Sequence, residues 1–293
     1  RISIGTFALF NSLCWTLTNP MSTLGMLIND LQRFFASASK IVELYYARST
    51  IVTRQDAVKK EGRVQGAVKF DHVTLKRNGT EVLHDINLDI KPGETIAIMG
   101  PTGCGKTSLI SLIPRFSDVS GGTVSVDGTP VGMYDLKKLR GSVGIATQDV
   151  FLFSGTIRSN IVLREEGIPD SEIMEVCRYV NADKFINKLD HGLDEEVRER
   201  GNNFSAGQRQ LLSFARTIIH KPSVMILDEA TANIDTETEL LIQDSLEKMR
   251  TVGTMLIVAH RLSTIQHADN IIVLSHGKIL EQGTHQQLLA RHG

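Results

Sequence analysis

The sequence predicts an α/β fold, in which short buried strands alternate with helices. Thr95–Met99 is an apolar run of strand length, and the following segment Ser108–Ile113 carries apolar residues at helical spacing. Val224–Asp228 is a second apolar run of strand length, and it ends in a carboxylate. The 293 residues, 41% hydrophobic and 22% charged, have a globular composition and suffice for one large domain or two modest ones.

The N-terminal segment is predicted to be a long membrane helix. Residues Ile2–Asn29 contain no Asp, Glu, Lys or Arg, and this length is sufficient to cross a bilayer. Pro20 and several Asn, Ser and Thr residues interrupt the stretch, and polar groups in membrane helices usually face a bundle interior. Arg33 and Lys40 follow, so the positive-inside rule places this end of the helix on the cytoplasmic side.

Apolar residues at helical spacing continue to Tyr45, so we assign residues 1–53 to this helix and a cytosolic extension, and 54–66 to a polar linker. Because the chain opens on Arg1 and runs at once into hydrophobic sequence, we expect it to be a fragment of a longer protein. Two alternatives remain for the uncharged stretch. One is a buried helix of a soluble protein, and the other is a signal peptide, which the polar interruptions fit poorly.

The segment Gly100–Thr107 fits the pattern G-x-x-x-x-G-K-[ST] at every fixed position. It joins a predicted strand to a predicted helix N-terminus, where backbone N–H groups and the helix dipole attract an anion. In such a P-loop, Lys106 reaches the outer phosphates of a nucleotide and the Thr107 hydroxyl binds Mg²⁺. The alternative is a glycine-rich turn with a chance lysine. The predicted phosphate contacts are Gly100, Pro101, Thr102, Gly103, Cys104, Gly105, Lys106, Thr107 and Ser108.

The second apolar strand leads into two consecutive carboxylates, Asp228 and Glu229. A buried strand that ends in Asp completes the magnesium site of a P-loop ATPase, so Asp228 is the predicted acid on the metal side. Glu229 is the predicted group that orients or deprotonates the attacking water. A surface loop that merely begins with Asp-Glu is the alternative, and the P-loop makes it the weaker one. The expected cofactors are ATP and Mg²⁺.

Between these elements, Phe204-Ser-Ala-Gly-Gln208 resembles the L-S-G-G-Q signature of ABC transporter nucleotide-binding domains, with two substitutions. A Ser and small residues at a helix N-terminus, here before the predicted helix Arg209–His220, form a second phosphate site. A helix N-cap without a ligand is the alternative. The resemblance implies that the site acts on the ATP of the opposite subunit through Ser205, Ala206, Gly207 and Gln208.

The resemblance extends to two single residues. Gln148, after the predicted strand Val143–Ala146, matches the glutamine that joins magnesium and water to the transmembrane part. His260, after the predicted strand Met255–Ala259, matches the switch histidine that contacts the γ-phosphate. The implied catalytic residues are Glu229, His260, Gln148 and Lys106, and the implied magnesium ligands are Thr107, Gln148 and Asp228.

Longer segments resemble exporters more than importers, notably Gln148–Ile157 and Val197–Gly201, and Ala232–Asp235 matches the loop that links two ATP sites. The resemblance covers about Gly66–Gly293. It implies an ATPase subunit in which ATP-driven dimer closure exports a hydrophobic or amphipathic substrate. It also implies that residues 1–53 include the last transmembrane helix, that the chain lies in the cell membrane with its nucleotide-binding domain in the cytoplasm, and that it pairs with a second half-transporter.

Two residues depart from the family pattern. Arg77 stands where the family usually has an aromatic residue that stacks on adenine. A guanidinium can also stack on a base, and a solvated charge at a strand edge is the equal alternative. Ala206 replaces a signature glycine, and exporters built from two different halves often carry such deviations. We therefore favour a heterodimer over a homodimer.

Two other functions are alternatives for a P-loop chain of this kind. A soluble ABC-type ATPase that acts on nucleic acid or ribosomes would lack the uncharged N-terminal stretch. The net charge of −1 gives no electrostatic reason to expect a nucleic-acid partner, and we expect none. A regulatory nucleotide-binding module without turnover would have lost the base at Glu229.

The expected architecture places the P-loop domain at residues 67–293, with a helical subdomain carrying the signature at about 157–219. The core sheet is expected to contain Thr95–Met99, Val224–Asp228 and Met255–Ala259. The antiparallel layer is expected from Val68–Leu75 and Val82–Ile90, and the last strands from Ile271–Ser275 and Lys278–Glu281.

Overall fold

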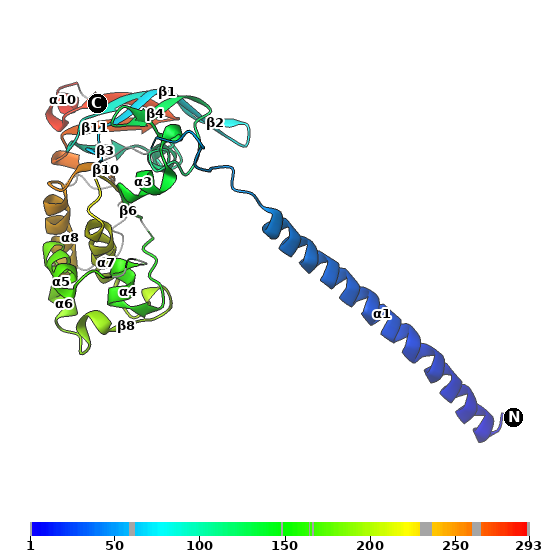
Figure 1. Ribbon diagram of the computed structural model, residues 1–293. Coiled ribbons are helices and arrows are strands. Elements are labelled where there is room, and N and C mark those ends of the chain that lie inside the picture. The colour runs from blue at the N-terminus through cyan, green and yellow to red at the C-terminus, as the bar shows by residue number, and fades with distance from the viewer. Residues whose placement is uncertain are drawn as a thin grey trace. The chain divides into compact units, whose positions relative to one another are not determined.

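In the computed structural model, the chain forms two compact units, Arg1–Thr50 and Ile51–Gly293 (Figure 1). The structure describes residues 2–58, 62–147, 149–163, 165, 167–228, 236–259 and 265–291.

The first unit is a single helix, α1, over Ile4–Tyr46. The Ser3 hydroxyl caps it by accepting the N–H of Thr6 at 3.2 Å, and Pro20 lies inside it. Of the helices that the structure describes, none combines the length and the apolarity needed to span a bilayer, so the predicted transmembrane span is not shown. The physical reason is that the Asn, Ser and Thr side chains spread along the uncharged stretch lower its mean hydropathy.

The second unit is built on a six-stranded sheet in the order β12-β11-β3-β10-β9-β6. All neighbours are parallel except β12, which pairs antiparallel with β11. Since parallel neighbours need crossover connections, this order makes an α/β sheet with elements on both faces. Its strands are β3 Thr95–Met99, β6 Val143–Ala146, β9 Val224–Asp228, β10 Thr254–Val258, β11 Asn270–Ser275 and β12 Lys278–Gly283.

A second, antiparallel sheet covers part of the unit in the order β2-β1-β4-β5. The strands are β1 Val68–Arg77, β2 Thr80–Ile90, β4 Gly121–Val126 and β5 Thr129–Pro130. The predicted antiparallel layer of the first two strands is confirmed, and β4 and β5 extend it. A small ribbon pairs β7 Gly155–Thr156 with β8 Glu196–Val197.

Figure 1 shows the two sheets at one end of this unit and the helices α4 to α7 at the other. Those four helices lie within residues 157–219, and α7 begins three residues before the predicted Arg209. The helices are α2 Lys106–Ser111, α3 Leu136–Gly141, α4 Ile157–Val162, α5 Asp170–Tyr179, α6 Asp183–Ile186, α7 Ala206–Ile219, α8 Thr236–Met249 and α10 His285–Ala290. The short 3₁₀ turns are η1 Val131–Met133, η2 Gly192–Asp194 and η3 Glu199–Gly201.

Burial on both faces of the core sheet explains why its central strands are apolar runs. In β9, Val224 and Ile226 pack into the cluster beneath the antiparallel sheet. Met225 and Leu227 pack into the cluster shared with the helices, which includes Leu211 of α7. Successive side chains of a strand point to opposite faces, so a strand covered on both sides has no polar face.

The chain that leads into the second unit is held against it by named contacts. The Val52 carbonyl accepts Arg115 Nη1 at 3.2 Å, and Val58 N–H donates to the Met133 carbonyl at 2.7 Å. Farther along, the Asp127 carboxylate accepts three consecutive backbone N–H groups at 2.7–3.0 Å, those of Gln65, Gly66 and Ala67. The described parts of the predicted linker therefore follow the surface of this unit.

Candidate functional site

The predicted P-loop forms a turn between β3 and α2. Gly100, Gly103 and Gly105 have φ values of 148°, 80° and 109°, a region that favours glycine. A Cβ at Gly100 would lie 2.0 Å from the Leu274 carbonyl oxygen, so a larger residue there would force the backbone of β11 to move. Only glycine at position 100 therefore allows the loop to lie this close to β11.

Lys106 is the first residue of α2, and its side chain is buried, with only 7% of the residue exposed. Its Nζ donates to the carbonyl oxygens of Gly100 at 2.7 Å and Pro101 at 3.0 Å. Cys104 Sγ lies 4.0 Å from the same nitrogen. The loop thus positions a buried ammonium at the phosphate-binding turn.

A cavity of about 340 Å³ brings the P-loop and the end of β9 together. Its polar lining includes Lys106, Thr107 and the half-buried Asp228. Val258 of β10, the register partner of Asp228, also lines it, because β10 lies between β3 and β9. The full described lining is Val82, Thr102, Gly103, Gly105, Lys106, Thr107, Ser108, Asp228 and Val258.

The donor set in this cavity suits a hard cation beside phosphate. A hydroxyl at Thr107 and a carboxylate at Asp228 are the oxygen donors that Mg²⁺ prefers, and Lys106 adds a positive charge for the outer phosphates. The residues present therefore fit a magnesium–nucleotide pair.

Sequence reasoning did not find the two valines of the cavity. Val82 comes from β2 and Val258 from the end of β10, and both look like ordinary strand residues in the sequence. Arg77 is exposed at the end of β1, opposite Thr80, and does not line the described part of the cavity. Its proposed stacking on adenine stays a prediction.

Three predicted catalytic residues, Glu229, His260 and Gln148, lie outside the described residues, as does the segment 232–235. Two of them adjoin described strand ends. Glu229 follows the last residue of β9, and His260 follows Ala259, one residue after β10. Their roles remain predictions.

The signature residues form the start of α7. Ser205 Oγ accepts the N–H of Gln208 at 3.2 Å, and Gln208 Oε1 accepts the N–H of Ser205 at 2.9 Å. This reciprocal pair is a capping box. Ala206, the first helical residue, is not among the residues with positive φ, so its methyl group imposes no backbone strain. Ser205, Ala206 and Gly207 stand apart from the described lining of the P-loop cavity, and Gln208 lines a separate hollow of about 470 Å³.

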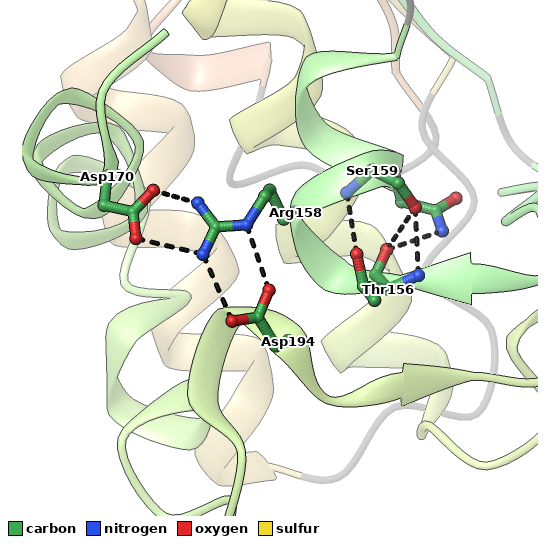
Figure 2. A network of polar contacts seen from close by, with 6 residues as sticks. Thr156, Arg158, Ser159, Asp170 and Asp194 are labelled. Carbon is green, nitrogen blue, oxygen red and sulfur yellow. Dashed lines mark hydrogen bonds and ion pairs between the residues drawn. The ribbon is translucent and has the colours of Figure 1, made fainter. Parts of the chain in front are cut away.

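Figure 2 shows an ionic network in the helical region that the sequence did not predict. Arg158 of α4 lies between Asp170, the first residue of α5, and Asp194 of η2. Its Nη2 donates to Asp170 Oδ2 at 2.9 Å, and its Nε donates to Asp194 Oδ1 at 3.0 Å. The hydrogen bond from Arg158 lowers the pKa of the Asp194 carboxyl. Beside it, Thr156 and Ser159 form the capping box that starts α4.

These features define a class of protein. The P-loop follows a parallel strand at its carboxyl end, and an acidic strand end lies in the same cavity. A capped helix that begins with a second predicted phosphate-binding motif lies in a separate helical region. This combination describes a P-loop ATPase. The ABC transporter family model matches residues 83–232, so this chain belongs to the ABC transporter family. This membership implies that the domain binds and hydrolyses ATP.

Two relatives are similar to the chain along nearly all of it. It is 42% identical over 293 residues to the uncharacterized ABC transporter ATP-binding protein YknV of Bacillus subtilis (strain 168), covering 100% of this chain and 48% of that protein. It is 39% identical over 289 residues to the ATP-dependent lipid A-core flippase of Syntrophus aciditrophicus (strain SB), covering 99% and 48%.

A solved structure, that of a bacterial Atm1-family ABC exporter with ATP bound, matches with a TM-score of 0.80 and 32% identity over 99% of this chain and 51% of that one. The chain thus spans about half the length of the relatives it matches. It contains the ATP-binding portion of an ABC transporter.

Proposed function

We propose that this chain powers the export of a hydrophobic or amphipathic substrate across the cell membrane, as part of a half-transporter. The observation that carries the proposal is the separation of its two phosphate motifs. The P-loop and Asp228 line one cavity, whereas the start of α7 lies outside its described lining. A site that needs both motifs is then completed by two chains.

In this proposal the P-loop holds the phosphates of ATP through its backbone N–H groups and the Lys106 ammonium. The backbone N–H donors are already fixed by the loop, so they meet the charge that spreads over the transferring phosphoryl group without reorganisation. Thr107 and Asp228, with Gln148, would hold Mg²⁺. When bound, the ion neutralises the charge on the β- and γ-phosphate oxygens.

We propose that Glu229 and His260 position the water that attacks the γ-phosphate. Glu229 orients the attacking water and accepts its proton, and His260 contacts the γ-phosphate, so both contribute positioning. Support for these roles comes from their place in the chain, one residue after Asp228 and one residue after Ala259.

The start of α7 is proposed to serve the ATP held by the P-loop of a second half-transporter. Ser205 supplies a hydroxyl, and the first turn of α7 supplies backbone N–H groups and the positive end of a helix dipole. ATP that binds the closed pair better than the open pair closes it by that difference in affinity. Ala206 at a signature glycine position favours a heterodimer over a homodimer.

We also propose that α1 belongs to the membrane domain, with the nucleotide-binding unit in the cytoplasm. Relatives named as exporters and flippases are similar over nearly the whole chain, α1 included. The Asn side chains of α1 would then face other helices of a bundle, since polar groups inside a membrane need partners. The hydroxyls of Thr16, Thr18 and Thr23 already donate to carbonyls of their own helix.

The first experiment measures the ATPase rate per molecule as a function of protein concentration. A rate that rises with concentration means that the chain pairs with itself and that Ala206 works in a homodimer. A rate near zero with intact ATP binding means that the site needs another chain's signature, as in a heterodimer. Failure to bind ATP at all would overturn the proposed site.

The second experiment tests the base in the reconstituted full-length transporter. The change Glu229→Gln should preserve ATP binding, abolish most turnover and trap the closed pair. The control Glu175→Gln, at an exposed position of α5, should leave turnover unchanged. Normal turnover in Glu229→Gln would remove Glu229 from the mechanism.

A further inference from the structure

A second hollow, of about 440 Å³, lies away from the ATP cavity and is strongly cationic. Four basic residues line it, Arg63, Lys137, Lys138 and Lys221, together with the single acidic residue Asp135. The chain as a whole carries a net charge of −1, so this local excess of positive charge is not a property of the whole surface. We call these four residues and Asp135 the basic pocket.

The basic pocket and the ATP cavity lie at opposite ends of the strands of the core sheet. Its floor includes Ser142 and Ser223, which directly precede β6 and β9. Asp228, at the other end of β9, lines the ATP cavity. Because β6 and β9 run parallel, one site lies at their amino ends and the other at the carboxyl end of β9.

The acidic groups beside the basic pocket offset only part of its positive charge, with Glu172 compensating Lys221. Asp135 Oδ1 accepts the backbone N–H of Lys138 at 2.9 Å and so caps α3. Glu172 is already paired with Lys221, with Oε1 2.7 Å from Nζ. Among the described residues, Arg63 and Lys137 have no carboxylate partner.

The four cations come from three separate parts of the chain. Arg63 precedes β1, Lys137 and Lys138 lie on α3, and Lys221 follows α7. Lys138 Nζ donates to the Gly62 carbonyl at 2.9 Å, which ties α3 to the segment that carries Arg63. The fold, not local sequence, therefore gathers like charges that repel one another in the absence of a counter-anion.

We propose that the basic pocket binds the phosphate group of a small, multiply charged anion. Guanidinium and ammonium groups together suit phosphate, because the guanidinium offers two parallel N–H donors and the ammonium a compact charge. The volume is that of a ligand-binding concavity. Serine hydroxyls at its floor are already used, since Ser142 Oγ donates to the Leu139 carbonyl, so charge and not hydroxyl donors would hold the anion.

The test is a calorimetric titration of the full 293-residue chain with inorganic pyrophosphate. All variants carry Lys106→Ala, which weakens phosphate binding at the P-loop. The pocket variant adds Arg63→Glu and Lys137→Glu. The control adds Lys69→Glu and Lys91→Glu, two exposed lysines elsewhere that change the net charge equally.

We expect pyrophosphate to bind the Lys106→Ala chain, with an affinity that falls as salt rises from about 20 to about 300 mM. The pocket variant should bind at least about tenfold more weakly, and the control within about twofold of its parent. The neutral variant Arg63→Gln with Lys137→Gln should lie between them. No binding at millimolar pyrophosphate, or equal weakening in pocket variant and control, would overturn the proposal.

A second measurement separates a soluble phosphate compound from a lipid headgroup. Flotation is compared on vesicles of phosphatidylcholine alone and of phosphatidylcholine with phosphatidylglycerol. An increase with phosphatidylglycerol that the pocket variant loses assigns the phosphate to a lipid. Pyrophosphate binding without such an increase assigns it to a soluble compound.

Discussion

Asn160 and Arg216 meet at two points inside the helical region. Arg216 Nε donates to the Asn160 carbonyl at 2.8 Å, and Nη2 donates to the Asn160 side-chain oxygen at 3.1 Å. Asn160 is 1% exposed, and burial lowers the pKa of Arg216. The same groups hold the loop before α4. Arg216 Nη1 donates to the Phe151 carbonyl, and Asn160 exchanges two hydrogen bonds with the Phe153 backbone.

This network joins the loop after Gln148 to α7, the helix that begins at the signature. Phe151 and Phe153 pack edge to face with ring centroids 5.1 Å apart, and both remain exposed. Asn160 and Arg216 therefore fix the position of an exposed aromatic pair relative to the signature helix.

The first prediction concerns this network. Asn160→Ala should lower the free energy of unfolding by about 3 kcal/mol, because it removes the side-chain oxygen that accepts Arg216 Nη2 and leaves the N–H and carbonyl of Phe153 without their partner. Urea denaturation of the chain measures it. The exposed control Asn187→Ala should stay within about 0.5 kcal/mol of the parent. Equal small effects from both changes would show that the network adds nothing to stability.

The second prediction compares two glycines of the P-loop. Gly100→Ala should lower the free energy of unfolding by about 2 kcal/mol or more and abolish ATP binding, because its Cβ would lie 2.0 Å from the Leu274 carbonyl oxygen. At Gly103→Ala no atom lies within 4 Å of the added Cβ. Only the backbone strain of its φ of 80° should therefore lower the free energy of unfolding, by about 1 kcal/mol. Denaturation and fluorescent-ATP titration measure both. Identical losses would mean that space at the loop does not matter.

The third prediction tests Asp228 as a magnesium ligand. Asp228→Asn should weaken ATP binding about tenfold, about 1.4 kcal/mol, when Mg²⁺ is present. In EDTA the affinity should match that of the parent, because the change then removes no metal contact. Fluorescent-ATP titrations with and without Mg²⁺ provide the comparison. A similar loss in EDTA would point to a different role for Asp228.

The fourth prediction is a pH dependence that arises from Arg158 and Asp194. The pKa of Asp194 is lowered from its ordinary value of 3.8 in the folded chain, chiefly by the hydrogen bond from Arg158. The unfolded chain then binds the proton more readily, so the contribution of the pair is present above pH 3.8 and is lost as the pH falls through the lower folded value.

Thermal unfolding between pH 6 and pH 3 tests this sign. The parent chain should lose more stability at the acidic end than Asp194→Asn, and the two curves should run parallel at about pH 6. Added salt should reduce the difference, since both groups are partly exposed. A steeper acid loss in Asp194→Asn than in the parent would contradict the direction of the shift.

The sequence by itself determined the elements whose causes are local. Thr95–Met99 and Val224–Asp228 are strands at those bounds, because side chains buried on both faces need an unbroken apolar run. The turn between β3 and α2 is encoded by glycines, since three of them adopt positive φ. The α/β class, the P-loop and the membership in the ABC transporter family follow from such short motifs.

Only the tertiary structure decided which elements lie side by side. The order of parallel strands places β10 between β3 and β9, so that Val258 joins Asp228 and the P-loop in one cavity. Likewise, Arg158 meets Asp194, and Arg63 shares a hollow with Lys221, across long stretches of chain. Parallel pairing depends on crossovers and shared burial, and these are properties of the packed chain that no local pattern encodes.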